Sequence, residues 1–348
     1  MFKRKKQIDV NLESFTPIER VKTLRGRYIP AFIHNMSYFF TKLQVYEDGL
    51  VDAWEMIDLD LFSGKLNSGW VKTAIPDGEN ISIHHLGEWE VTDGKWDYDK
   101  ESFFKHIKSV IKDLNPEMQN LHNCFGQTTK KINNVNTSIL GMGNGKPYLE
   151  DGPEFMQKRI KGDDFSVFVQ LNTQSFALAN LCVFSNGAIQ IFGIPETLTY
   201  TLPELESAIN NKKIITKPEK GAAIMIYGLG SFVVGECNYA VNVDQLLLEV
   251  KENINRLQGK ETASELCSKL FYQYCEDPTA ELREQLKTAY ESIPEHLRMY
   301  VLGDQDRKDI PVRMAIYGDD EIKKWSHYVL AEELGEDLPS IEMPSAKD

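Results

Sequence analysis

The sequence predicts an α+β protein built from two tandem copies of a hairpin–strand–helix unit, followed by a helical C-terminal region. Three observations lead to this prediction. Two aromatic and β-branched segments, 138 residues apart, both end in a turn dipeptide, and two later apolar segments, 143 residues apart, share one pattern. Each copy then runs into an amphipathic helix. Three matches in the same order indicate an internal duplication, with a pseudo-twofold relation between the copies.

The first copy is expected over residues 25–115. Its turn dipeptide is Asp48-Gly49, which accepts the positive φ of a type I′ hairpin turn. A strand with a glycine kink follows, and then a helix in which apolar side chains recur at 3.6-residue spacing. These three parts are expected at residues 37–59, 81–91 and 103–114.

The second copy is expected over residues 163–258, with Asn186-Gly187 at its hairpin turn. Its first hairpin strand is apolar at successive positions, which predicts a sheet covered on both faces. A glycine- and asparagine-rich linker is expected at residues 125–162. Its run of alternating glycines lacks the spacing and the Ser or Thr of a phosphate-binding loop.

The C-terminal region, residues 260–335, is expected to be helical and to end in an extended tail at residues 336–348. Amphipathic stripes predict two helices, the second with Pro278 in its first turn. A short strand is expected at residues 311–317. A last helix is expected from about residue 320 to residue 334, N-capped by Asp319 and stopped by Gly335.

Composition narrows the functional classes. The 348-residue chain has 39 basic and 52 acidic residues, a formal net charge of −13. Nucleic-acid binding depends on cationic side chains that neutralise phosphates, so we do not expect so acidic a chain to bind DNA or RNA. We expect no membrane span, because no stretch of 18 apolar residues occurs. The five cysteines form no CxxC pair, and residues 1–15 lack a secretory pattern, so the expected location is the cytoplasm.

The richest local chemistry is the segment His84-His85-Leu86-Gly87-Glu88. On a strand the two histidines would point to opposite faces, so one could enter a cleft. His84, His85 and Glu88 are therefore the candidate catalytic residues. Asp58 and Asp60, with His84, are candidate ligands of a divalent metal. The simpler interpretation is that the histidines are hydrogen-bonded sheet residues and the carboxylates face solvent.

Four of the five tryptophans lie in the first copy. Trp54 and Trp89 align with aromatic residues of the second copy, so both are expected in the core. Trp70 and Trp96 have no counterpart and lie beside polar segments, which makes them candidate anchors of a protein interface. Ordinary packing in the core or at its rim is the alternative for both.

No cofactor motif occurs, so we expect no cofactor. The acidic charge, the missing catalytic motifs and the unpaired tryptophans predict a cytosolic interaction or regulatory scaffold. Its partner would be another protein, in one version a basic toxin that the chain neutralises; self-association into a homo-oligomer also remains open. A hydrolytic, metal-assisted enzyme with its site near His84 and His85 is one alternative. A small-ligand sensor is another.

Overall fold

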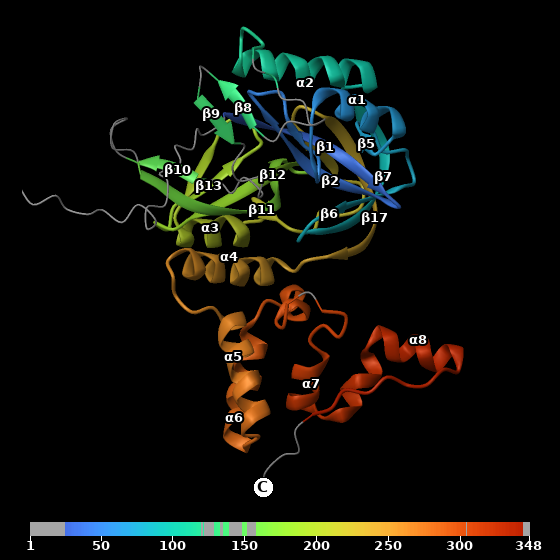
Figure 1. Ribbon diagram of the computed structural model, residues 1–348, viewed down its shortest axis with the longest axis vertical. Helices are drawn as coiled ribbons and strands as arrows, with labels where there is room; N and C mark the ends of the chain where they lie inside the picture. Colours follow the sequence, from blue (N-terminus) through green and yellow to red (C-terminus); the bar gives the residue numbers. More distant parts are fainter. Residues whose placement is uncertain are drawn as a thin grey trace, which may run out of the picture.

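The fold is built on one curled sheet of 15 strands, with helices on its outer sides (Figure 1). Most of its strands come from residues 26–114, the first half of the sheet region, and from residues 158–257, the second half. The computed structural model describes residues 25–119, 121, 129–132, 135–138, 148–151, 158–303 and 305–343. A further group of helices follows from residue 263 onward. The expected mixture of a sheet with a helical C-terminal region is therefore confirmed in this coarse form.

The first half supplies seven strands and two helices. They are β1 (Gly26–Asn35), β2 (Ser37–Tyr46), β3 (Val51–Asp52), β4 (Met56–Ile57), α1 (Leu59–Ser68), β5 (Val71–Lys72), β6 (Asn80–Ile83), β7 (Gly87–Trp96) and α2 (Lys100–Leu114). The turn at Asp48-Gly49 does join two strands, but the second strand is only β3. The long hairpin is β1 with β2, and β1 was not predicted.

The second half repeats this order of elements. They are β11 (Lys158–Asn172), β12 (Ser175–Phe184), β13 (Ile189–Phe192), β14 (Leu198–Tyr200), α3 (Leu202–Asn210), β15 (Ile214–Ile215), β16 (Ala223–Ile226), β17 (Gly230–Ala240) and α4 (Val243–Leu257). The pairings also repeat. β2 with β6 and β12 with β16 are parallel, whereas β6 with β7 and β16 with β17 are antiparallel.

The two halves meet where β7 pairs antiparallel with β17 in the middle of the sheet. Gly87 and Gly230 occupy equivalent positions at the ends of this contact, with φ of +155° and +143°. A Cβ on either glycine would meet the backbone of the opposite strand, at Tyr239 and Ala240 or at Lys95 and Trp96. Close approach of the strands therefore requires glycine at both positions.

Three apolar cores surround the sheet. One lies between the halves and is centred on the fully buried Trp89, as the sequence predicts for this residue. The other two lie under the helices of each half, where α2 buries Phe103 and Ile107 and α4 buries Leu246 and Val250. The helical stripes were thus predicted correctly. Strand β12 is buried at almost every position, as expected for a sheet covered on both faces.

The predicted strand with a glycine kink proves to be two strands in each half. β6 and β7 are joined by a turn at residues 84–86, and β16 and β17 by a turn at residues 227–229. The expectation that His84 and His85 alternate across a strand is therefore wrong, because both lie in the turn. Only the pattern of apolar residues on either side was visible in the sequence, and a short apolar run does not reveal where the chain reverses.

The region between the halves contains strands among its described residues. β8 (Thr129–Ile132) pairs with β9 (Val135–Ser138), and β10 (Tyr148–Asp151) pairs with β11. β11 starts at Lys158, inside the range expected as linker. The alternating glycines of that range and Cys124 lie outside the described residues. So does the basic run near the N-terminus, Lys3-Arg4-Lys5-Lys6.

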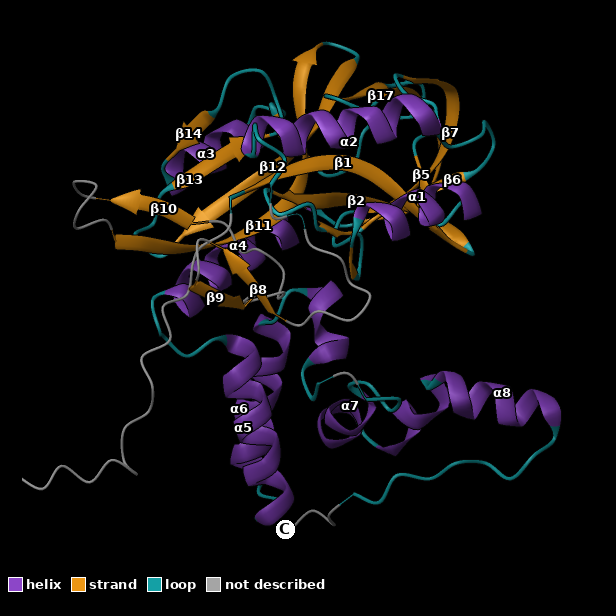
Figure 2. Ribbon diagram, turned by 45° about the horizontal axis from the view of Figure 1, so that its top comes forward, coloured by secondary structure: helices purple, strands orange, loops and turns teal. Residues whose placement is uncertain are grey.

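The C-terminal region has its own apolar core. Its elements are α5 (Ala263–Glu276), α6 (Ala280–Ser292), η3 (Glu295–Tyr300), α7 (Ile310–Tyr317), η4 (Asp319–Lys324) and α8 (Ser326–Leu334). Figure 2 shows α8 projecting to one side of the other helices. No helix among the described residues is both long and apolar enough to cross a membrane.

Three expectations for this region are corrected. Residues 311–317 form α7 rather than a strand, because Pro311 suits a helix start and the apolar run is too short to show its period. The last helix is interrupted at Trp325, which has extended backbone angles. The residue before η4 is Gly318, so Asp319 is not the cap. Gly335 does end α8 in a left-handed conformation, as predicted.

Candidate functional site

His85 occupies a turn position that suits glycine. Its φ is +56°, and the matching residue in the second half, Gly228, has φ of +79°. The two turns close in the same way: Leu86 N–H donates to the Ile83 carbonyl, and Leu229 N–H to the Ile226 carbonyl, both at 3.0 Å. A left-handed residue with a side chain costs about 1–2 kcal/mol. In the first half His85 adopts this unfavourable conformation, which places an imidazole where the second half has no side chain.

Glu249 lies on the buried face of α4, between Leu246 and Val250. Its side chain is only 3% exposed. Burying a carboxylate is unfavourable unless hydrogen bonds and opposite charge compensate it. Compensation comes from two histidines: His85 Nδ1 lies 3.2 Å from Oε1, and His296 Nε2 lies 2.8 Å from Oε2. An ionised carboxylate only accepts, so both facing ring nitrogens carry hydrogen.

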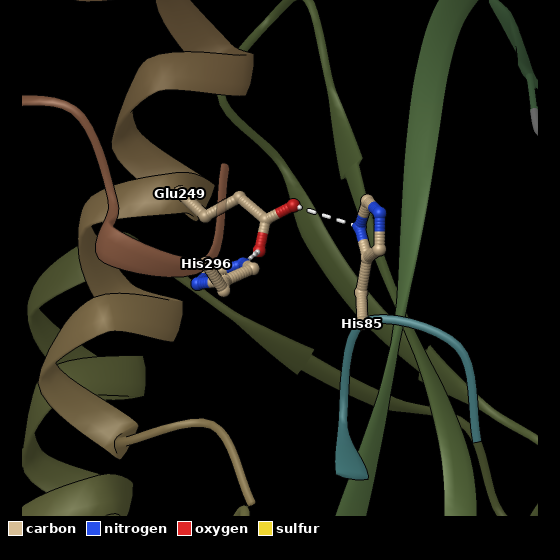
Figure 3. Close-up of side chains that lie close together, drawn as sticks. All are labelled: His85, Glu249 and His296. Carbon is tan, nitrogen blue, oxygen red and sulfur yellow. Dashed lines mark hydrogen bonds and ion pairs between the residues drawn. The ribbon is translucent and has the colours of Figure 1, made fainter. Parts of the chain in front are cut away.

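His296 reaches Glu249 from the C-terminal region. It lies in η3, which follows α6, and the segment is fixed to α4 because Glu295 N–H donates to Gln245 Oε1 at 2.6 Å. Figure 3 shows His85 and His296 approaching the Glu249 carboxylate from different parts of the chain. The cluster therefore joins the first half, the second half and the C-terminal region at one point.

The surroundings shift two pKa values in this cluster. Burial on its own would raise the pKa of Glu249, but the hydrogen bonds from His296 and His85 outweigh it and hold the pKa below its usual range. The His84 ring lies against the His85 ring, tilted by 33°, with ring centroids 3.9 Å apart. Partial burial, followed by the charge of His85, lowers the pKa of His84. His84 is therefore neutral near pH 7 and able to accept a proton.

These side chains also have the chemistry of a metal site. One ligand atom from each of His85, Glu249 and His296 lies within 4.8 Å of the other two, the one group of three such residues found among the described part of the chain. Two imidazoles and a carboxylate are ligands that Zn²⁺ accepts. His85 is 35% exposed and His296 19%, so the cluster is reached from solvent on the His85 side.

The other expected site residues lie elsewhere. Asp58 caps α1 by accepting from Leu61 N–H at 2.8 Å, and Asp60 is an exposed residue of the same first turn. Glu88 accepts from Asn238 Nδ2 at 2.6 Å rather than from a histidine. The structure thus brings His84 and His85 together but leaves the predicted carboxylates apart from them.

The structure buries and exposes the tryptophans differently from what the sequence predicts. Trp54 was expected in the core but is 53% exposed, with a φ of +70°. Its ring lies 5.4 Å from Phe39 and 6.1 Å from Trp70. Trp70 itself is half-buried against the first-half core. Trp96 is also half-buried, and its Nε1 donates to the Ile75 carbonyl at 3.1 Å. A role of Trp70 and Trp96 as interface anchors stays a prediction.

Sequence reasoning missed Glu249 and His296. The one available signal for Glu249 was its place on the apolar stripe of α4, where an acidic residue needs a buried partner. Its partners are 164 and 47 residues away in sequence, so spacing could not reveal them. Nothing in the sequence around His296 distinguishes it from a surface histidine.

Comparison with known proteins gives two family matches. Residues 262–341, the C-terminal region, match the model described as Domain of unknown function (DUF7639). Residues 15–118 and 153–261 match the model described as Domain of unknown function (DUF7638), and these two segments enclose the two halves of the sheet. No curated protein and no solved structure matches the chain. Since the second model covers more than half of the chain, the protein belongs to the family described as Domain of unknown function (DUF7638).

Proposed function

We propose that this protein is an interaction or regulatory scaffold that binds another protein through an aromatic patch formed by Phe39, Trp54 and Trp70. The observation that carries the proposal is the exposure of Trp54, whose side chain is among the large apolar groups left at the surface, at 53% accessibility. Tryptophan is enriched among the residues that dominate the energy of protein interfaces. A large exposed ring beside two further aromatic rings is typical of such an anchor.

The backbone of Trp54 supports the same proposal. A φ of +70° is unfavourable for a residue with a bulky side chain and costs about 1–2 kcal/mol. In spite of this strained backbone, about half of the residue faces water. A strained residue that keeps a large ring at the surface is expected where the residue is retained for function.

The charge of the chain supports a basic partner. A net charge of −13 would steer a cationic protein toward the surface, and Asp52 and Glu55 flank Trp54 in sequence. Neutralisation of a basic toxin is one version of this function. The four cysteines in the described residues are free thiols, which favours a reducing compartment such as the cytoplasm.

The test is affinity capture of the tagged, full-length chain expressed at native level in its own host. Three forms are compared: wild type, Trp54→Gly, and Tyr272→Ala as a control that removes an equally exposed ring, 55% accessible, from α5. We expect a stoichiometric partner with wild type and the control, weakened by salt and lost with Trp54→Gly. Recovery of the same partner with Trp54→Gly, or of none with wild type at low salt, would contradict the proposal.

A cavity in the second half favours small-ligand sensing as a second candidate. Its volume is about 850 Å³, and its lining includes three lysines, Lys212, Lys217 and Lys220, together with Glu219 and Asp244. Lys220 pairs with Glu236, so the ammonium groups of Lys212 and Lys217 are the ones that would bind an anionic ligand such as a small phosphate or carboxylate. A thermal-shift screen with such anions would support sensing if one stabilises wild type but not Lys212→Gly. The idea fails if none raises the melting temperature.

The hydrolytic alternative depends on His84 and His85. Neither this cavity nor a smaller one of about 510 Å³ is lined by these histidines, Glu249 or His296. The hydrolytic alternative is therefore supported only by the histidine cluster. It stays a prediction, and assays with ester and phosphoester substrates would test it.

We also propose that the two halves arose by duplication of one unit. The repeated order of elements, the repeated pairings and the equivalent glycines Gly87 and Gly230 support this origin. The pseudo-twofold axis would pass between β7 and β17. Substitution of Gly87 and of Gly230 by alanine tests whether the two positions are equivalent in energy as well as in geometry.

A further inference from the structure

We propose that His85, Glu249 and His296 bind one Zn²⁺ ion, and that this ion fastens the C-terminal helical region to the sheet. The proposal is independent of the aromatic patch. It concerns side chains from a turn, a helix and a short 3-10 segment that are remote in sequence but converge in the structure (Figure 3).

The spacing of the ligand atoms is close to that of a zinc site. Zn–N and Zn–O bonds of about 2.0–2.2 Å in a tetrahedron place neighbouring ligand atoms ~3.4 Å apart. His85 Nδ1 lies 3.2 Å from Oε1 of Glu249 and His296 Nε2 lies 2.8 Å from Oε2, so each imidazole is near this value from a different oxygen of one carboxylate. Binding of the ion replaces these two hydrogen bonds: both facing nitrogens then present a lone pair, and their hydrogens move to the other ring nitrogen or to solvent. The histidine nitrogens lie at most 4.8 Å apart. Closing that gap needs a shift of ~1.4 Å or less, which a side-chain rotation of the part-exposed His85 can supply.

The ligand types select the metal. Two imidazole nitrogens with one carboxylate suit zinc-class ions, whereas Ca²⁺ and Mg²⁺ take sites made of oxygen ligands alone. Three protein ligands leave a fourth position open, which a water molecule can fill. A divalent ion would also compensate the carboxylate charge that Glu249 buries, with the ion within bonding distance.

The three ligands come from three different parts of the chain, so an ion bound to all of them would link those parts. His85 belongs to the first half, Glu249 to the second half and His296 to the C-terminal region. Bonds from one ion to all three would join these parts more firmly than two hydrogen bonds do. Without the ion, the hydrogen bonds between α4 and η3 include the His296–Glu249 pair and the bond from Glu295 N–H to Gln245.

The experiment is a Zn²⁺ titration of the full-length chain after chelation and dialysis, followed by calorimetry. His85→Gly is the informative variant, because glycine is the residue of the equivalent turn and fits the left-handed backbone. His327→Ala is the control, since it removes a histidine outside the cluster. We expect one ion per chain, unchanged affinity in His327→Ala, and a loss in His85→Gly greater than the ~10–100-fold that removal of a supporting residue costs.

Limited proteolysis tests the fastening. In wild type, Zn²⁺ is expected to slow cleavage in the connection between α4 and α5, residues 258–262, and to raise the melting temperature. In His85→Gly and Glu249→Gln it is expected to do neither. Failure of wild type to bind Zn²⁺ stoichiometrically, or equal affinity in His85→Gly, would overturn the site. Binding without any protection from cleavage would overturn the fastening.

Discussion

Adding a single methyl group at Gly230 is expected to destabilise the protein strongly, because this glycine lies against the opposite strand. Its φ of +143° is a conformation that residues with a side chain rarely adopt, at a cost of about 1–3 kcal/mol. The new Cβ would also meet the Lys95 carbonyl oxygen and the Trp96 Cα, backbone atoms that cannot rotate away. Overpacking of this kind costs about 1–3 kcal/mol more. Gly230→Ala should therefore lower the free energy of unfolding by ~2–6 kcal/mol.

The equivalent substitution Gly87→Ala should have a similar effect, because its Cβ would meet the Tyr239 carbonyl oxygen and the Ala240 Cα. Gly64→Ala is a matched control of opposite sign. It lies inside α1, where an alanine Cβ would have no neighbouring atom within 4 Å. Alanine there should stabilise by ~0.5–1 kcal/mol. Urea denaturation followed by tryptophan fluorescence measures all three. A change within about 0.5 kcal/mol for Gly230→Ala, as at an ordinary surface site, would refute the reasoning.

Three further predictions concern strained residues and buried thiols. Trp54→Gly, at φ +70°, should leave the melting temperature unchanged or raise it; a clear fall would show that the indole supports the fold. Lys212→Gly should likewise stabilise by ~1 kcal/mol in urea denaturation, because Lys212 has φ of +57° after α3; a loss of stability would contradict this. Burial raises the pKa of the Cys182 and Cys267 thiols to about 12. The second cause is the negative charge of Asp164 near Cys182 and of Asp309 near Cys267. Both are therefore protonated at pH 8 and should resist a thiol reagent in the folded protein, whereas rapid labelling would disprove their burial.

The periodic parts of the fold were the predictable ones. α2 and α4 followed from apolar stripes, because a helix that covers a sheet must turn one face toward it. Strand β12 followed from its continuous apolar run. The unpredicted elements, such as β1 and α1, have weaker patterns: β1 contains Pro30, and α1 contains Gly64 and buries only Phe62 and Leu66.

The candidate site was only half predictable. His85 was a candidate because it lies in the polar segment His84-His85-Leu86-Gly87-Glu88, which is visible in the sequence alone. Its role could not be seen, since a tight turn rather than a strand decides where the ring points. Glu249 and His296 come from segments that meet only through packing of the C-terminal region against α4. Contacts of that kind depend on tertiary structure and have no local signature.

Native mass spectrometry of the full-length chain, gently purified from its own host, tests the proposed function most directly. We predict a complex in which a second protein accompanies the chain in whole-number stoichiometry, and its absence when Trp54→Gly is purified in the same way. If neither the wild-type protein nor Trp54→Gly carries a second protein, the result would contradict a role as an interaction scaffold.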